Sequence, residues 1–290
     1  MKIFFLFFLM FLPVTGEVKV VTYNVRQDTS GDRGERDWKN RSPHVVEFLK
    51  KGNFSIIGLQ EAKHNQVEDV KKGLSKFVQI GVGRDDGRKS GEYSPIFFDP
   101  EIWKADMAEQ GTFWLSDTPK KPGSMTWGNR VTRICSWVRL IGKEGESLYV
   151  YNTHWDHQSQ PSREKAAELI LKRVSERKHS GAPVILMGDF NATTTNPAIK
   201  VLTGSGALVD HGGEKQPVHE LLFSAALAAN ELQHLPHVVV FAFWTELIAT
   251  CFDAFNDHSK VFDFFLRDAR HFFHQFEVFW KARDDGNRVG

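Results

Sequence analysis

The chain has little cysteine and almost no excess charge of either sign. Only two of its 290 residues are cysteines, Cys135 and Cys251, so the fold cannot depend on a disulfide framework. The two thiols could pair in an oxidising compartment, but Cys135 lies in an apolar stretch, residues 133–138, which favours a buried, inert thiol. Lys and Arg number 37 against 36 Asp and Glu, a formal net charge of +1. This balance excludes a bulk basic footprint for nucleic acid and leaves open a local basic cleft.

The chain also lacks an apolar run long enough to span a bilayer at its N-terminus. Residues 3–12 are apolar but too short, with Lys2 before them and the small residues 14–16 after them. This order predicts a signal peptide over residues 1–16, with the mature protein starting at Glu17. A buried first strand or a retained anchor is the alternative. The signal peptide implies a secreted or periplasmic location.

Internal repeats and long linkers are absent too, and the 41% hydrophobic content suffices for one sizeable core. Helical segments alternate with apolar strands. Ser42-Pro43 is a good N-cap and first-turn pair for one helix. Ser162 is the predicted N-cap of a second helix, which covers residues 163–179.

Four apolar segments predict strands that end in residues able to bind a metal or orient water. They are residues 19–26 with Asn24, 55–61 with Gln60 and Glu61, 147–151 followed by Asn152 and His154, and 183–187 followed by Asp189 and Asn191. Each polar end alone is as well explained by turn chemistry of Asn and Asp. Together, four such ends indicate a catalytic sheet edge.

The order Tyr-Asn, Gln-Glu, Asn-Thr-His and Gly-Asp-Phe-Asn resembles the endonuclease/exonuclease/phosphatase superfamily, the deoxyribonuclease I-like phosphoesterases. Residues 82–87 and 91–98 resemble the intervening segment of secreted bacterial members. The resemblance covers about residues 18–210. It implies an α/β fold of the α+β kind, a four-layer α-β-β-α sandwich of two mixed sheets, over a domain of residues 17–215.

The resemblance also implies a role for each site residue and a divalent cofactor, Mg²⁺ or Mn²⁺. Glu61 is the main metal ligand and Asn24 helps to hold the metal or its water shell. His154 is the imidazole near the scissile phosphate, Glu92 orients it, and Arg133 contacts the phosphate. Asp189 and Asn191 position water and phosphate or hold a second metal. For Glu92 and Arg133 the alternative is a solvated charge at the start of a strand.

Residues 216–290 form an atypical, phenylalanine-rich tail. A complete family member carries a further Asp in a strand and a final Asp-His pair. Asp257-His258 lacks the flanking residues of that pair, so we interpret it as a chance match. Residues 261–280 instead have the spacing of an amphipathic helix, which predicts that the second sheet is incomplete. A reading-frame change and a lineage-specific tail are both open explanations.

Three functions fit these features. The first is hydrolysis of a phosphodiester or phosphomonoester, by a nuclease or a phosphatase. The second is a sphingomyelinase-like phospholipid hydrolase whose tail contacts membranes, although aromatic stripes more often pack in a core. The third is an inactive, incomplete product. The expected partner is a phosphate-ester substrate, nucleic acid being one allowed class. The sequence indicates neither the ester nor the oligomeric state.

Overall fold

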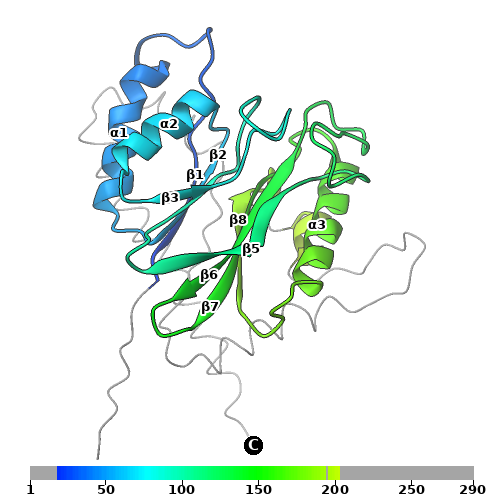
Figure 1. Cartoon of the computed structure of the whole chain (residues 1–290). Coiled ribbons are helices and arrows are strands. Elements are labelled where there is room, and N and C mark those ends of the chain that lie inside the picture. The colour runs from blue at the N-terminus through cyan, green and yellow to red at the C-terminus, as the bar shows by residue number, and fades with distance from the viewer. Residues whose placement is uncertain (1–17, 194, 203–290) are drawn as a thin grey trace, which may run out of the picture. The chain divides into compact units, whose positions relative to one another are not determined.

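The computed structural model describes residues 18–193 and 195–202 (Figure 1). The predicted signal peptide, the domain boundary at 215, the tail helix over 261–280, the Asp257-His258 pair, the incomplete second sheet and the pairing of Cys251 all concern residues outside this part of the chain. Within the described residues, no helix is both long and apolar enough to cross a membrane.

Within the described residues, the first sheet has four strands in the order β1-β2-β4-β3. The strands are β1 (Val20–Asn24), β2 (Ile56–Gln60), β3 (Val78–Ile80) and β4 (Ile96–Phe98). β1 and β2 run parallel, and the other two pairs are antiparallel. The helices α1 (Trp38–Lys51) and α2 (His64–Gly73) cover one face of this sheet (Figure 1), and a short 3-10 helix, Gly34–Arg36, precedes α1.

The second sheet also has four described strands, in the order β5-β6-β7-β8. They are β5 (Trp103–Trp114), β6 (Ile134–Gly142), β7 (Ser147–His154) and β8 (Val184–Asp189). β7 and β8 are parallel, whereas β5, β6 and β7 pair in antiparallel fashion. The helix α3 (Gln160–Ser175) lies beside this sheet (Figure 1), and α4 (Pro197–Leu202) contacts α3.

Three apolar layers hold these elements together. One lies between the two sheets and contains Ile56, Val150 and Met187. A second, with Leu49 and Leu59, joins the first sheet to α1 and α2, and a third joins the second sheet to α3 and α4. The predicted α/β fold, with two mixed sheets between helical layers, is confirmed. The thiol of Cys135 is fully buried on β6, and burial raises its pKa.

The four predicted strands correspond to β1, β2, β7 and β8, but both helix starts were wrong. α1 begins four residues before Ser42 because the Asp37 side chain accepts a hydrogen bond from Lys39 N and serves as N-cap, which leaves Pro43 inside the helix. α3 begins after Ser159, whose side chain accepts from Ser162 N. In each case a second capping residue lies upstream of the predicted one.

Strand alternation explains how the polar ends come together. Side chains two apart on a strand share a face. On β7, Leu148 and Val150 face the other sheet, and so do Asn152 and His154, because they continue the same parity. The same parity on β1 and β8 brings Asn24 and Asp189 to the space between the sheets. In the parallel pairs Asn24 lies beside Gln60 and His154 beside Asp189.

Gly188 is needed where β8 meets β7. Its φ is +149°, and a Cβ at this position would lie 2.1 Å from the carbonyl oxygen of Thr153. We expect Gly188→Ala to destabilise the fold by about 2–4 kcal/mol, because backbone cannot move aside as a flexible side chain can. Thermal unfolding checks this. Gly181→Ala is the control, since its Cβ would meet nothing within 4 Å. Equal melting temperatures for the two variants would contradict the prediction.

Candidate active site

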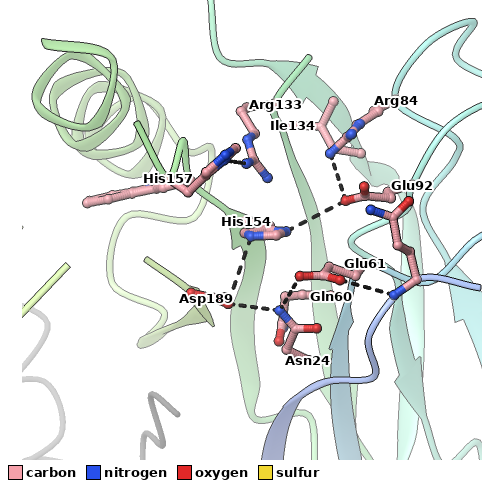
Figure 2. A network of polar contacts seen from close by, with 12 residues as sticks. Asn24, Gln60, Glu61, Arg84, Glu92, Arg133, Ile134, His154, His157 and Asp189 are labelled. Atoms are coloured by element: carbon pink, nitrogen blue, oxygen red, sulfur yellow. Dashed lines mark hydrogen bonds and ion pairs between the residues drawn. The ribbon is translucent and has the colours of Figure 1, made fainter. Parts of the chain in front are cut away.

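Two carboxylates converge on the amide of Asn24 at the ends of β1, β2 and β8. Asn24 Nδ2 donates to Glu61 Oε1 and to Asp189 Oδ2, each at 2.9 Å (Figure 2). Asn24 Oδ1 accepts a hydrogen bond from Arg26 N at 2.9 Å, which fixes the amide orientation. Asp189 is buried, and burial together with the nearby charge of Glu61 raises its pKa. Two anions therefore share one uncharged donor.

Glu61 has an unusual backbone conformation immediately after β2. Its φ is +62°, a region that residues other than glycine rarely adopt and that persists only where the surroundings impose it. The second carboxylate oxygen, Oε2, accepts from Gln27 N at 3.0 Å. The two oxygens of Glu61 thus have different partners, and only Oε1 faces Asn24.

His154 lies between two carboxylates (Figure 2). Its Nδ1 is 3.8 Å from Glu92 Oε2, and its Nε2 is 3.8 Å from Asp189 Oδ2. Both separations exceed a hydrogen bond. Burial, followed by the charges of Arg133 and Arg84, lowers the pKa of His154 well below its ordinary value. The imidazole is therefore uncharged at neutral pH and can accept a proton.

Arg84 holds Glu92 in place. Arg84 Nη1 donates to Glu92 Oε2 at 2.7 Å, and Glu92 is only 7% exposed. Burial raises the pKa of Glu92, although Arg84 opposes the shift. The alternative of a solvated charge is wrong for Glu92. Arg84 was not predicted as a site residue, although it lies in the 82–87 segment that carried part of the family resemblance.

Arg133 lines a small pocket, and some of its N–H groups make no hydrogen bond. It is 3% exposed, and burial lowers its pKa to about 10, so it stays charged at neutral pH. Its Nη2 lies 3.0 Å from His157 Nδ1, whereas Nε and Nη1 are buried without a hydrogen-bond partner. A buried cation with open N–H groups suits an anionic oxygen. Arg133 and His154 line one small pocket, together with Arg84, Glu92, Tyr93, Ser94, Thr132 and Ile134.

Asp156 and His157 were not among the predicted site residues, yet both adjoin Arg133. Asp156 Oδ2 is 3.8 Å from Arg133 Nε, and Asp156 is 2% exposed. Its other oxygen accepts from Gln158 N and Ser159 N, which fixes the turn before α3. Asp156 and His157 lie two and three residues after His154, and this proximity was the sequence signal that could have identified them as site residues.

The two sheets are joined beneath the site by a buried amide network. Gln60 Nε2 donates to Asn152 Oδ1 at 2.7 Å and to Thr22 Oγ1 at 2.9 Å. Asn152 Nδ2 in turn donates to the carbonyls of Leu59 and Pro95, both at 2.8 Å. Asn152 therefore spans from β7 to the first sheet, and the network sets the spacing between Asn24 and the catalytic candidates of the second sheet.

Asn191 lies two residues beyond Asp189, the last residue of β8. Its φ is +46°, its Nδ2 donates to Trp155 O at 2.9 Å, and its backbone N–H donates to Asp189 Oδ1 at 3.0 Å. The structure thus brings the seven predicted residues into one region. Asn24, Glu61 and Asp189 form one contact group, His154 and Glu92 adjoin it, Arg133 lies across the pocket from Glu92, and Asn191 supports Asp189.

The donor set fits a hard divalent cation with few protein ligands. Among the described residues, no group of three or more His, Cys, Asp and Glu side chains forms a ready cage for a metal. Mg²⁺ usually keeps several waters and takes one or two carboxylates. Glu61 Oε1 and Asp189 Oδ2 converge on the amide of Asn24. A cation at this place would neutralise the two carboxylates better than the uncharged amide does. With Asn24 Oδ1 bound to Arg26 N, the amide would have to turn to offer its oxygen.

The uncharged state of His154 is open to direct measurement. In metal-free protein, we expect the imidazole to remain unprotonated at pH 6.5, its ordinary pKa, because burial and the Arg133 and Arg84 charges oppose a proton. The unfolded chain takes up that proton as the pH falls below 6.5, so His154 alone makes the fold less stable in acid. Imidazole nitrogen chemical shifts across pH 5–8 check this, and half-protonation near pH 6.5 would contradict it.

Comparison with known proteins gives consistent matches. The profile described as Endonuclease/Exonuclease/phosphatase family matches residues 21–280. An endonuclease/exonuclease/phosphatase structure from Bacteroides vulgatus is 34% identical with a TM-score of 0.62, over 65% of this chain and 71% of that one. A mannosyl-6-phosphatase from Bacteroides thetaiotaomicron is 35% identical with a TM-score of 0.59, over 63% and 69%. A probable RNA exonuclease of Saccharomyces cerevisiae is 24% identical over 208 residues, 64% of this chain and 40% of the relative's length.

Proposed function

The chain belongs to the endonuclease/exonuclease/phosphatase family, and from this membership we propose that it is a divalent-metal-dependent hydrolase of phosphate esters, with Mg²⁺ or Mn²⁺ as cofactor. One observation supports the proposal above the others. Asn24, Glu61, His154 and Asp189 converge from both sheets at the ends of parallel strands. An anionic ester resists attack, and this site offers both charge neutralisation and proton transfer.

Each residue has a task in this proposal. Glu61 and Asn24 would hold the cation, which when bound supplies neutralisation of charge on the phosphate. Arg133 binds a phosphate oxygen through Nη1, which has no hydrogen-bond partner. The uncharged His154 and the carboxylate of Asp189 lie side by side and act on one attacking water, whose proton passes to one of the two. Asn191 keeps Asp189 in orientation through its backbone N–H.

A phosphomonoester is the first substrate class to test. The mannosyl-6-phosphatase is 35% identical and covers 63% of this chain, whereas the RNA exonuclease is 24% identical and this chain spans 40% of it. The net charge of +1 also gives no general attraction for a polyanion. We therefore propose a small phosphorylated compound, such as a hexose 6-phosphate, as the partner of the site.

Purified full-length protein tests the proposal against four substrates. These are mannose 6-phosphate, bis-p-nitrophenyl phosphate, a single-stranded RNA oligonucleotide and sphingomyelin vesicles, each with Mg²⁺, Mn²⁺ or excess chelator. Phosphate release from the monoester, lost in chelator, supports the proposal. Turnover of RNA alone would favour a nuclease, and turnover of sphingomyelin alone would favour a lipid hydrolase. Full turnover in chelator would overturn metal dependence.

We also propose export of the protein, as a secreted bacterial member of the family. The charged, apolar and small-residue order of residues 1–16 supports it. N-terminal sequencing of material recovered outside the cytoplasm is expected to begin near Glu17. Recovered material that begins at Met1 would refute the cleavage.

For residues 216–290 we propose a departure from the family pattern, by a frame change or by a lineage-specific tail. The unmatched flanks of Asp257-His258 support it. The family profile match extends to residue 280, which argues against a departure from the family pattern. The coding sequence from codon 205 onward, read in all three frames, decides. A family-like Asp strand and Asp-His motif in another frame establishes the frame change.

A further inference from the structure

Gln66 on α2 is a glutamine with no exposed surface, close in the chain to the predicted metal ligand. Its side chain makes three hydrogen bonds, all to backbone. Nε2 donates to Arg26 O at 2.9 Å, and Oε1 accepts from Asp28 N at 2.8 Å and from Lys63 N at 3.1 Å. Only the last of these is the usual contact of a third-position helix residue with the helix N-cap. The other two reach the loop after β1.

The hydrogen bonds of Gln66 to Arg26 and Asp28 lie on either side of Gln27, the residue that holds Glu61. Gln27 lies between Arg26 and Asp28, and its backbone N–H is the donor to Glu61 Oε2. The loop is not a relaxed one, because Arg26 has a φ of +56°. Arg41 adds two bonds from α1, to the carbonyls of Val25 and Arg26. Gln66 ties the loop to α2 through a buried side chain, and the exposed Asn65 Nδ2 also donates to Asp28 Oδ2 at 2.8 Å.

The bond to Lys63 fixes the other side of Glu61. Lys63 is two residues after Glu61, and Glu61 itself is held at a φ of +62°. The same carboxamide thus restrains the backbone that follows Glu61 and the loop that contacts its side chain. Without these restraints the Gln27 N–H would no longer hold the Glu61 carboxylate, which could then turn away from Asn24.

We propose that Gln66 is a positioning residue for the metal site: it fixes Gln27 so that Glu61 presents Oε1 alone toward Asn24 and Asp189. The inference rests on the proposed metal-dependent function. Outer groups that orient a ligand typically account for about ten- to hundredfold in metal affinity. A residue that only capped α2 would contribute to stability and leave the affinity unchanged.

The experiment compares Mn²⁺ binding by calorimetry, without substrate, in three full-length variants. Gln66→Leu removes all three bonds and is expected to weaken Mn²⁺ binding by about ten- to hundredfold. Gln66→Glu keeps an acceptor for Lys63 N and Asp28 N but loses the donor to Arg26 O, so its affinity should fall between. Gln160→Leu is the matched control, because Gln160 also makes several hydrogen bonds, to Glu164 and Asn196, and touches none of the metal-site residues.

A second readout separates positioning from general damage. If Gln66 positions the ligand, Gln66→Leu raises the Mn²⁺ concentration for half-maximal turnover by a larger factor than it lowers maximal turnover. Mn²⁺ binding by both Gln66 variants as tight as in the wild type would overturn the inference. If Gln66→Leu does not fold, unchanged affinity in Gln66→Glu alone overturns it. A wild type that binds no Mn²⁺ overturns the proposed metal dependence and this inference with it.

Discussion

Glu61→Gln is expected to lower phosphoester turnover by at least about a thousandfold, the rate equivalent of several kcal/mol of lost charge stabilisation. The change keeps the size of the side chain and removes its charge. It also leaves one oxygen where two were hydrogen-bonded, to Asn24 Nδ2 and to Gln27 N. An amide N–H₂ must therefore face one of these donors. A hard cation prefers an anionic oxygen, so affinity for Mg²⁺ or Mn²⁺ falls as well.

Three measurements together check this prediction. Turnover is followed against metal concentration, Mn²⁺ binding is followed without substrate, and melting is recorded in chelator to show that the fold survives. Glu68→Gln is the matched control, because Glu68 is an exposed carboxylate on α2 a short distance along the chain. If Glu61→Gln kept wild-type turnover while chelator still abolished it, the metal would have to be held elsewhere.

The sequence predicted the strands well because apolar segments bounded by polar residues carry their own signal. β1, β2, β7 and β8 all lie where they were expected. Two polar ends were placed just outside their strands, whereas His154 and Asp189 are the last residues of β7 and β8. The helix starts failed for a local reason: Asp37 and Ser159 cap the helices upstream of equally plausible residues, Ser42 and Ser162.

The site was predicted in part by family resemblance and in part by the polar residues at the ends of four predicted strands. Asn24 and Asp189 lie at the ends of strands in different sheets, and the alternation of side chains along each strand turns both toward the space between the sheets. Arg84, Asp156 and Gln66 were missed, because their roles arise from contacts with loops rather than from any periodic pattern. Gln66 illustrates this. Its position in the helical sequence gives no sign of a role in the site, and only the tertiary fold places Arg26 and Asp28 within reach of its side chain.

His154→Ala and Asp189→Ala are each expected to lower turnover by at least about a hundredfold, the usual scale for a lost proton-transfer group. His154 Nε2 and Asp189 Oδ2 are 3.8 Å apart, and Asp189 also accepts from Asn24 Nδ2. If the two act on one water, they form a unit, and the double variant should lose little more than the worse single variant. Independent roles would instead multiply the two losses.

Steady-state turnover of the two single variants and the double variant on one phosphate ester, at saturating metal, completes the cycle. His44→Ala is the control for loss of an imidazole, since His44 is exposed on α1. Melting temperatures show whether the fold is kept; removal of Asp189 leaves Asn191 N without its acceptor and should cost about 1 kcal/mol. Wild-type turnover in either single variant, with the fold intact, would make that residue a structural one and leave the proton transfer to the other.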